Sequence, residues 1–455
     1  MNDSLRLYAE TARPQFHFSA RKNWLNDPNG LVFFDGEYHL FYQYNPFGTE
    51  WGNMHWGHAV SPDLVHWEEL PIALYPDALG TMYSGSAVVD WSNTTGFQSG
   101  EDPPLVAIYT AAGGDDPGSA GQKYTQCLAF SSDRGRTWEK YAANPVQGHI
   151  AGQNRDPKVI WDPAHSRWII CLYLEGNDFA LFTSPDLKQW TQIQAFALPG
   201  SDECPDFFPL PITGEPDETR WVFIGANGLY LLGEFDGQKF TVTEGTLRPE
   251  YGANYYAAQT YSDIPDADGR RISIAWMRGG VYPEMQFSQQ MSFPCALTLH
   301  RHAEGLRLHR NPVREIETLR GAAHHWQDLT VTAGENPLSG VSGELFEILL
   351  EVADQPGGNA WGLHLGAHEV RYDPQSRTLT CLGCAAPLEA EDGRITLHLL
   401  VDRTSVEVFA NNGQLSLSSC FVPAPGKSSL ELFAEKSAVQ ITSLAVYELH
   451  SAWPI

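Results

Sequence analysis

Long hydrophobic runs are absent from this sequence of 455 residues. No stretch reaches the roughly 18 apolar residues that a membrane-spanning helix needs. The opening residues, MNDSLR, also lack the apolar core of an export signal. The sequence therefore predicts a soluble protein with no membrane partner. It leaves the compartment open between the cytoplasm and secretion with the signal already removed.

Cysteines and positive charges are also scarce. The seven cysteines are scattered and odd in number, which is not the pattern of a disulfide framework. Cys381 and Cys384 form a lone CxxC motif without a second pair, so we expect no zinc site there. The formal net charge is −26, which argues against a nucleic-acid partner, because such partners need a basic surface. A neutral partner fits this charge.

Short β-rich runs recur through the first two-thirds of the chain. They are too short for buried helices, contain β-branched and aromatic residues, and are separated by Gly, Pro, Asn and Asp clusters, which predicts strands. The runs are Tyr38–Tyr42, Leu105–Thr110, Trp168–Leu174, Trp221–Gly225 and Ile272–Met277. Their centres are about 50 to 67 residues apart, a period typical of repeats that each form one small sheet.

A second repeated element has the same spacing. It is a Ser/Asp turn followed by a tryptophan, and it occurs at Ser61–Trp67, Ser132–Trp138 and Ser184–Trp190. The aspartate can accept hydrogen bonds from the amides of its own turn, and the tryptophan can pack against a neighbouring sheet. Together the two repeats predict a five-bladed β-propeller over residues 1–311.

The last third of the chain has a different pattern. Residues 312–324 are expected to form a linker. Beyond it, apolar and polar residues alternate in the runs Glu344–Ala353, Ile395–Val401, Ser405–Phe409 and Val439–Tyr447. Asn411-Asn412-Gly413 between such runs is a hairpin signal. We therefore predict a β-sandwich domain over residues 325–455.

Three carboxylates lie where repeats begin, each followed closely by proline. Asp27 occurs in WLNDPNG, Asp156 in RDPK and Glu203 in ECPDFF. Each pattern by itself is also ordinary in turns. In a propeller, however, the first strand of every blade lines the central axis, so equivalent positions converge at one end. We therefore expect Asp27, Ser84, Asp156, Glu203 and Glu250 to surround a funnel-shaped site.

Two of these acids suit the cleavage of a glycosidic bond. A retaining glycosidase needs two carboxyls about 5–5.5 Å apart. We assign Asp27 as the ionised nucleophile and Glu203 as the acid/base, because the apolar residues after Glu203 are expected to raise its pKa. Arg155 is expected to lower the pKa of Asp156 and keep it as an anion that stabilises the transition state. The hypothesis requires Asp27 and Glu203 to face one shared hollow.

The motifs resemble those of the β-fructosidases of glycoside hydrolase family 32, which include invertases, inulinases and levanases. The matching segments run in order through nearly the whole chain: WLNDPNG at 24–30, FYQYNP at 41–46, WGNMHWGH at 51–58, YSGSAV at 83–88, RDPK at 155–158, ECPDFF at 203–208, YAAQT at 256–260, IAWM at 274–277 and VDRTSVEVFANNG at 401–413. The resemblance implies an all-β fold, with a five-bladed propeller joined to a β-sandwich, and no metal or organic cofactor.

The same resemblance implies an activity and a site. The expected reaction releases terminal β-D-fructose from inulin, levan or sucrose, so the expected partner is a fructose-containing saccharide. Asp27 would be the nucleophile, Asp156 the transition-state stabiliser and Glu203 the acid/base. The residues implied to line the pocket for the terminal fructose are Asn26, Gln43, Trp51, Tyr83, Ser84, Arg155 and Trp276.

Details of the motifs refine this expectation. The segment YNPFGTEWGNMHWGH is more similar to exo-acting inulinases and levanases than to sucrose-specific invertases, which favours fructan ends. His55 and His58 in this segment lack a third ligand, so we expect hydrogen-bonding or packing roles. Glu250 stands where the family usually has an aspartate, which is expected to change a sugar contact. Cys295 stands where an arginine is usual, with a role that the sequence leaves open.

Other functions remain open from the sequence alone. A fructosyltransferase shares the first chemical step, and only its products distinguish it. A non-catalytic fructan-binding propeller would lack a reacting carboxyl, and all three are present here. A hydrolase of pentose polymers on a related scaffold fits NDPNG and ECPDFF less well. Linkage preference, chain-length preference and a homo-oligomeric state also stay open.

Overall fold

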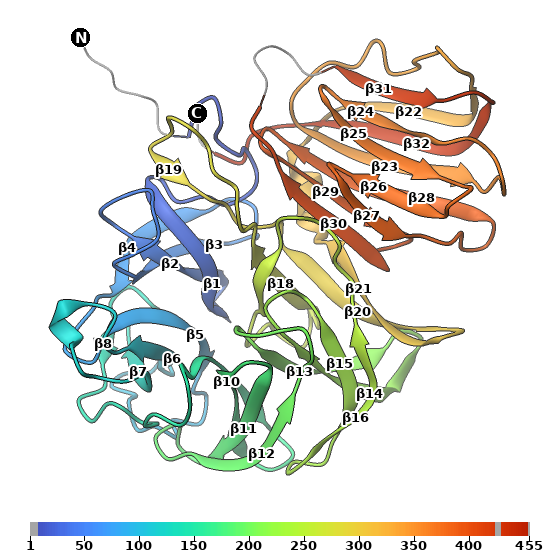
Figure 1. The fold of residues 1–455 in the computed structure, drawn as a ribbon. Coiled ribbons are helices and arrows are strands. Elements are labelled where there is room, and N and C mark those ends of the chain that lie inside the picture. The colour runs from blue at the N-terminus through green and yellow to red at the C-terminus, as the bar shows by residue number, and fades with distance from the viewer. Residues whose placement is uncertain (1–7, 424–428, 454–455) are drawn as a thin grey trace, which may run out of the picture.

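The computed structural model describes residues 8–423 and 429–453, and the chain folds almost entirely into β-strands in two domains (Figure 1). The MNDSLR segment, on which the expectation about an export signal depends, lies outside the described residues. Within residues 8–423 and 429–453 there are two short 3₁₀ helices, η1 (Pro117–Ser119) and η2 (Arg314–Leu319). Among the described residues, no helix has the length and apolarity needed to cross a membrane.

Four sheets form the N-terminal domain. The first has the order β19-β1-β2-β3-β4 and contains β19 (Phe287–Ser288), β1 (Asn23–Phe34), β2 (Glu37–Asn45), β3 (His55–Ser61) and β4 (Glu68–Leu74). The second contains β5 (Thr81–Val89), β6 (Leu105–Ala112), β7 (Thr125–Ser131) and β8 (Glu139–Lys140) in that order. The third contains β9 (Arg155–Asp162), β10 (Arg167–Glu175), β11 (Asp178–Ser184) and β12 (Thr191–Ala197).

The fourth sheet is larger and has the order β16-β15-β14-β13-β20-β18-β17, with β21 paired to β20. Its strands are β13 (Asp206–Ile212), β14 (Glu215–Ile224), β15 (Tyr230–Phe235), β16 (Phe240–Leu247), β17 (Tyr256–Thr260), β18 (Arg271–Trp276), β20 (Cys295–His302) and β21 (Gly305–Pro312). The sheet is this wide because Ile212 of β13 pairs in parallel with Leu299 of β20.

The innermost strands of these sheets close a ring. Strands β1, β5, β9, β13 and β17 contact one another in this order, and β17 contacts β1 (Figure 1). The Phe33 amide donates to the Ser262 carbonyl at 3.0 Å and the Ser262 amide donates to the Leu31 carbonyl at 2.9 Å, which joins the two ends of the ring. Each predicted apolar run lies in the strand after an innermost one. The propeller is confirmed, whereas five blades remain a prediction, because the fourth sheet extends beyond one blade.

The repeated Ser/Asp turns have the predicted hydrogen bonds. Asp63 accepts from the amides of Val65 and His66 at 3.0 and 2.8 Å, and equivalent bonds occur at Asp133 and Asp186. In the second copy, Ser131 rather than Ser132 bonds the aspartate, at 2.7 Å. The tryptophan of this copy, Trp138, packs edge-on against Phe41 of β2 at 5.2 Å, so the turns fasten adjacent sheets to each other.

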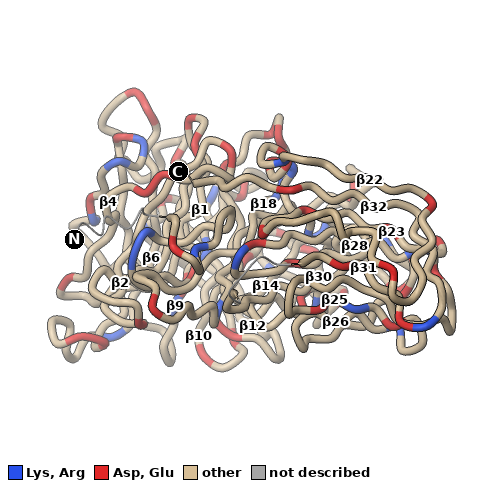
Figure 2. Tube along the Cα trace, turned by 90° about the horizontal axis from the view of Figure 1, so that it is seen from above, with Lys and Arg blue, Asp and Glu red and all other residues tan. Residues whose placement is uncertain are grey.

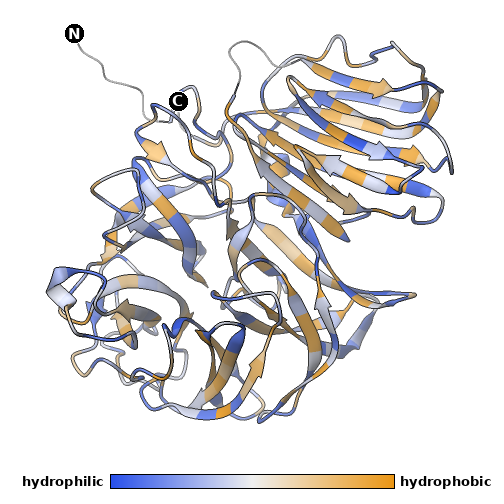
Figure 3. Ribbon diagram, in the orientation of Figure 1, coloured by the Kyte–Doolittle hydropathy of each residue, from blue (hydrophilic) through white to orange (hydrophobic). Residues whose placement is uncertain are grey.

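Two packed sheets form the C-terminal sandwich. One has the order β22-β32-β23-β28-β29-β30, with β22 (Arg320–Val331), β32 (Val439–Leu449), β23 (Phe346–Ala353), β28 (Arg394–Asp402), β29 (Ser405–Ala410) and β30 (Leu415–Cys420). The other contains β27 (Cys384–Pro387), β26 (Thr378–Cys381), β25 (His368–Asp373), β24 (Trp361–Leu365) and β31 (Leu430–Ala434). Hydrophobic and polar bands alternate along these strands (Figure 3), as expected when one face of each sheet is buried.

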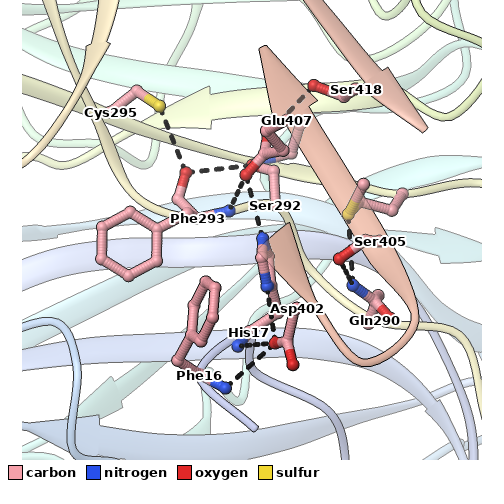
Figure 4. A network of polar contacts seen from close by, with 12 residues as sticks. Phe16, His17, Gln290, Ser292, Phe293, Cys295, Asp402, Ser405, Glu407 and Ser418 are labelled. Atoms are coloured by element: carbon pink, nitrogen blue, oxygen red, sulfur yellow. Dashed lines mark hydrogen bonds and ion pairs between the residues drawn. The ribbon is translucent and has the colours of Figure 1, made fainter. Parts of the chain in front are cut away.

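The two domains share a buried interface that includes charged groups. His17 of the propeller lies between two sandwich carboxylates, with its Nδ1 2.8 Å from Asp402 and its Nε2 3.0 Å from Glu407 (Figure 4). Glu407 also accepts from the Phe293 amide at 2.8 Å. Elsewhere, acidic residues are spread along both domains, with basic residues interspersed among them (Figure 2).

Candidate active site

A pocket of about 880 Å³ opens at one end of the propeller ring. Its walls contain every pocket and catalytic residue expected from the sequence except Glu250. The lining residues are Trp24, Asn26, Asp27, Gln43, Glu50, Trp51, Tyr83, Ser84, Asp115, Tyr124, Gln153, Arg155, Asp156, Glu203, Tyr256, Trp276, Arg278, Gly279, Val281 and Gln289. The structure thus brings together residues that are widely separated along the chain, from Trp24 to Gln289.

Irregular strand pairing positions these side chains. In β1, β5 and β9 the register with the next strand shifts at Asn26–Asp27, Tyr83–Ser84 and Asp156–Pro157, respectively. β17 has a similar shift after Tyr256. A bulge inserts an extra residue and redirects side chains, and bulges are common beside active sites. Here the innermost strands bulge where they reach the pocket, so their polar side chains point into it.

Asp27 lies partly exposed at the base of the pocket. Its Oδ2 accepts a hydrogen bond from Ser84 Oγ at 2.6 Å, and its Oδ1 accepts one from Asn26 Nδ2 at 3.2 Å. The thiol of Cys204 lies 3.5 Å from Asp27 Oδ2 and also 3.5 Å from Asp156 Oδ2. The same sulfur therefore contacts two of the three predicted reacting carboxylates.

Asp156 is more deeply buried and has a strained backbone. Its φ is 62°, a left-handed conformation that is uncommon outside glycine. Its amide donates to Thr110 Oγ1 at 3.0 Å, and its Oδ2 accepts from the Cys204 amide at 3.1 Å. The Arg155 Nε lies 3.6 Å from the same carboxylate. These contacts fix the carboxylate in one orientation.

The expected direction of the Asp156 pKa shift is wrong. The pKa of Asp156 is raised to about 7, because burial and the nearby carboxylates of Glu203 and Asp27 outweigh the lowering by Arg155. The sequence shows the adjacent arginine but not the burial or the other two acids. The protonated form of Asp156 therefore persists to higher pH than the neighbouring arginine alone would allow.

Glu203 lies opposite Arg155, three residues before β13 begins. Arg155 Nη2 donates to its Oε1 at 2.8 Å, and the Glu203 side chain keeps 30% of its exposure. Burial raises the pKa of Glu203, Arg155 lowers it and Asp27 raises it. The predicted direction is confirmed and burial is its first cause, although Phe207 and Phe208 belong to two hydrophobic clusters of the propeller.

The three acids and Cys204 share a single close cluster. One oxygen of Asp156, one oxygen of Glu203 and the Cys204 sulfur all lie within 4.8 Å of one another. Burial raises the pKa of the Cys204 thiol well above its usual range, so the sulfur keeps its proton. Arg155 provides the positive charge at this point by contacting both carboxylates. The arrangement suits proton transfer and stabilisation of a cation in the pocket.

Buried amides and indoles form the rest of the base. Gln43 is 2% exposed and donates to the Met82 carbonyl at 2.8 Å. Asn26 accepts from the Trp24 indole at 2.8 Å. Trp276 is 8% exposed and donates to Gln289 at 3.0 Å. Although it belongs to an apolar run, it lies in the pocket wall. The base is thus rigid and rich in hydrogen-bonding groups.

Glu250 does not lie in the pocket, so its interpretation as a substrate-binding residue is corrected. The innermost strand of its repeat begins only at Tyr256, and Tyr256 lines the pocket instead. Glu250 is 3% exposed and forms an ion pair with Arg310 at 2.6 Å. It also accepts from the Ser418 amide of β30 at 2.8 Å. The Glu250 carboxylate therefore joins the propeller to the sandwich.

The other unusual positions also lie outside the pocket walls. Cys295 is fully buried and its thiol points to the Phe293 carbonyl at 3.3 Å. His55 bonds the Asn53 carbonyl at 2.6 Å. His58 bonds His39 at 3.0 Å and stacks on Phe41 at 4.0 Å. The expectation of hydrogen-bonding and packing roles for both histidines is confirmed.

Several pocket residues were missed from the sequence. They are Trp24, Glu50, Asp115, Tyr124, Gln153, Tyr256, Arg278, Gly279, Val281 and Gln289. Trp24 and Tyr256 belong to the family motifs WLNDPNG and YAAQT, so their positions in these motifs could have indicated a place in the pocket. Asp115 and Tyr124 both lie in the loop that follows the strand of the Leu105–Thr110 run. Nothing in their local sequence indicates which way that loop turns.

Comparisons with known proteins agree with this geometry. Residues 17–312 match the description "Glycosyl hydrolases family 32 N-terminal domain", and residues 315–448 match "Glycosyl hydrolases family 32 C terminal". A levanase of Bacillus subtilis (strain 168) is 41% identical over 98% of this chain and 72% of its own length. The extracellular exo-inulinase of Aspergillus ficuum is 31% identical over 98% of this chain and 96% of its own length. The crystal structure of exo-inulinase from Aspergillus awamori has a TM-score of 0.87 at 29% identity and covers 98% of this chain and 100% of that chain.

Proposed function

The chain belongs to glycosyl hydrolase family 32, and from this premise we propose that it is a retaining β-fructosidase that removes terminal fructose from fructans or sucrose. Asp27 is the nucleophile, Glu203 the acid/base and Asp156 the transition-state stabiliser. The observation that carries the proposal is the convergence of these three acids around Arg155 and Cys204 at the base of one pocket.

The first step breaks the bond between the fructose anomeric carbon and the leaving oxygen. The Asp27 carboxylate attacks that carbon, while the protonated Glu203 gives its proton to the leaving oxygen. The raised pKa of Glu203 increases the fraction that holds this proton. Ser84 and Asn26 hold Asp27 in position through its two oxygens. The products of this step are a fructosyl ester on Asp27 and a free leaving alcohol.

The second step releases fructose. Glu203, now ionised, takes a proton from a water molecule, and the water oxygen attacks the anomeric carbon and frees Asp27. Positive charge develops on the sugar ring in both steps. Asp156 faces that charge, and a cation beside it favours its ionised form despite the burial that raises its pKa. The configuration at the anomeric carbon is inverted twice and hence retained.

The shape of the pocket favours cleavage from chain ends. Asn26, Gln43, Ser84 and Asp156 at its base are each at most 5% exposed, while Trp51 at its mouth is 55% exposed. A closed base admits one terminal sugar, whereas cleavage within a chain would require room for sugars on both sides. The relatives named levanase and exo-inulinase support fructans as the substrate class, and the name exo-inulinase supports cleavage at chain ends.

Product analysis tests this function. Purified protein is incubated separately with inulin, levan and sucrose, and the products are resolved over time. Early free fructose without shorter oligomers is the expected result. A ladder of intermediate oligosaccharides would contradict end-wise hydrolysis, and lengthened oligosaccharides would indicate fructosyl transfer. Binding of these saccharides without any product would indicate a non-catalytic fructan-binding protein.

A further inference from the structure

A loop of the second repeat brings an acidic residue to the mouth of the pocket. Residues 113–124 connect β6 to β7, and Asp115 within this loop is exposed and lines the pocket. The neighbouring Asp116 caps η1 by accepting from the Gly118 amide at 2.6 Å. The Gly114 amide donates to the Ser119 carbonyl at 3.1 Å. These bonds within the loop fix its shape and leave the Asp115 carboxylate directed toward the pocket wall.

Two tyrosines of the pocket wall meet this carboxylate. The Tyr124 hydroxyl donates to Asp115 Oδ1 and Oδ2 at 3.1 and 3.0 Å, and the Tyr83 hydroxyl donates to Asp115 Oδ2. The two rings lie 5.5 Å apart and edge-to-face, and Trp51 lies edge-on to Tyr83 at 6.2 Å. Burial raises the pKa of Tyr124 to about 12, so its hydroxyl keeps its proton.

The three groups together present hydrogen-bond acceptors to the pocket. Each tyrosine hydroxyl has one proton, and each donates it to Asp115, so only oxygen lone pairs remain. An ionised carboxylate offers about four acceptor sites, and the tyrosines do not occupy all of them. Such a cluster suits donor hydroxyl groups of a neutral sugar. It repels a phosphate or carboxylate at the same place.

The depth of the cluster indicates which sugar it contacts. The reacting acids and their amide partners form the buried base, where the terminal fructose must sit to reach Asp27. Asp115 and Trp51 are exposed at the mouth of the same pocket, on the side where the leaving sugar would extend toward solvent. Tyr83 connects the two levels, because it adjoins Ser84 in the same bulge of β5.

From this placement we infer that Asp115, with Tyr83 and Tyr124, binds the hydroxyl groups of the sugar that leaves, and so helps to determine which fructosides the enzyme accepts. The inference rests on the proposed function, since it assumes that terminal fructose occupies the base. It reassigns Tyr83, which the sequence placed beside the terminal fructose, to the leaving-group side of the pocket.

Ligand binding to an inactive background tests the inference. Glu203→Gln protein, with and without Asp115→Asn, is titrated calorimetrically with sucrose and with methyl β-D-fructofuranoside, whose methyl aglycone has no hydroxyl group of its own. Asp115→Asn is expected to weaken sucrose binding so that the ratio of the two Kd values changes about fivefold, as for the loss of one hydrogen bond. Tyr124→Phe is expected to shift the ratio in the same direction by a smaller factor. Asp178→Asn, an exposed and equivalent substitution outside the pocket, serves as the control.

Each outcome decides the matter. An equal weakening of both ligands by Asp115→Asn, or no change in either, would overturn the inference. If neither ligand binds the Glu203→Gln protein, the inference fails together with the site. Turnover is measured separately on the wild-type protein. A wild-type protein that binds both ligands but releases no fructose would refute the proposed function. The comparison of the two Kd values would then still test whether Asp115 contacts the second sugar.

Discussion

Two clusters of acids in this protein differ mainly in the number of positive partners. The pocket cluster consists of Asp27, Asp156 and Glu203 with one guanidinium, that of Arg155. The interface cluster contains the carboxylates of Glu250, Asp402 and Glu407 together with His17 and Arg310. The first cluster opens to a pocket, whereas the side chains of the second are almost fully buried.

The pKa values respond in opposite directions. Burial and neighbouring acids raise the pKa of Asp156 and Glu203. Burial also opposes ionisation of Asp402 and Glu407, yet their hydrogen bonds with His17 and other partners outweigh it and lower both pKa values. Burial alone therefore does not set the charge of a carboxyl. The donors around it decide whether it is suited to proton transfer or to holding two domains together.

The largest expected effect concerns the pocket cluster. Asp27→Ala and Glu203→Gln are each expected to lower kcat by about 10³-fold or more, because each removes a group that we propose reacts with the substrate. The thermal midpoint should not fall, because each change removes one of several crowded like charges. Steady-state kinetics and thermal unfolding check both points. Wild-type turnover in either variant would refute the assigned roles.

The interface cluster should show the opposite pattern. Arg310→Met leaves the carboxylates of Glu250 and Glu407 buried without their guanidinium partner, and the free energy of unfolding should fall by about 3–5 kcal/mol. Turnover per folded molecule should stay near the wild-type value. Urea unfolding measures the change. Arg301→Met, which removes an exposed partner of Glu215, is the control, and an equal loss in both variants would contradict a special role for the interface.

The stability that the domain interface provides should also depend on pH, because of His17. Burial lowers the pKa of this residue, but its hydrogen bonds with Asp402 and Glu407 raise it to about 9, above the usual 6.5. Protonated His17 therefore contributes up to about 3 kcal/mol to the free energy of unfolding, and this contribution is complete below pH 6.5. It declines as pH rises and is lost above about pH 9. Urea unfolding between pH 6 and pH 10 measures the decline. His17→Gln should flatten it, and an unchanged slope in that variant would exclude His17 as the cause.

The smallest expected effect is a shift in the pH profile of the pocket. Arg155 lowers the pKa of both Asp156 and Glu203, so Arg155→Gln should move the profile of kcat/KM toward higher pH by about one unit. Profiles measured on the same substrate from pH 4 to pH 9 test this. Arg136→Gln, which removes an exposed guanidinium of the propeller, is the control. A lower rate with an unmoved profile would mean that Arg155 only binds substrate.

The pattern of the sequence was enough to predict much of the architecture. Apolar runs at a regular period indicated the propeller, and alternation after residue 325 indicated the sandwich, because both patterns reflect short-range physics of strands and turns. The motifs around Asp27, Asp156 and Glu203 also located the pocket residues correctly at its walls. Glu250 was misplaced because the repeat period does not reveal a loop that leaves its blade to pair with β30.

The sequence by itself determined which acidic side chains are candidates for the reaction and roughly where along the chain they lie, because turn chemistry and strand periodicity are local. Only the tertiary structure decided the pKa directions, the place of Asp115 at the pocket mouth and the interface role of Glu250. These properties depend on burial and on charges from distant segments, such as Asp27 beside Glu203, and electrostatic energy follows distance in space rather than distance along the chain.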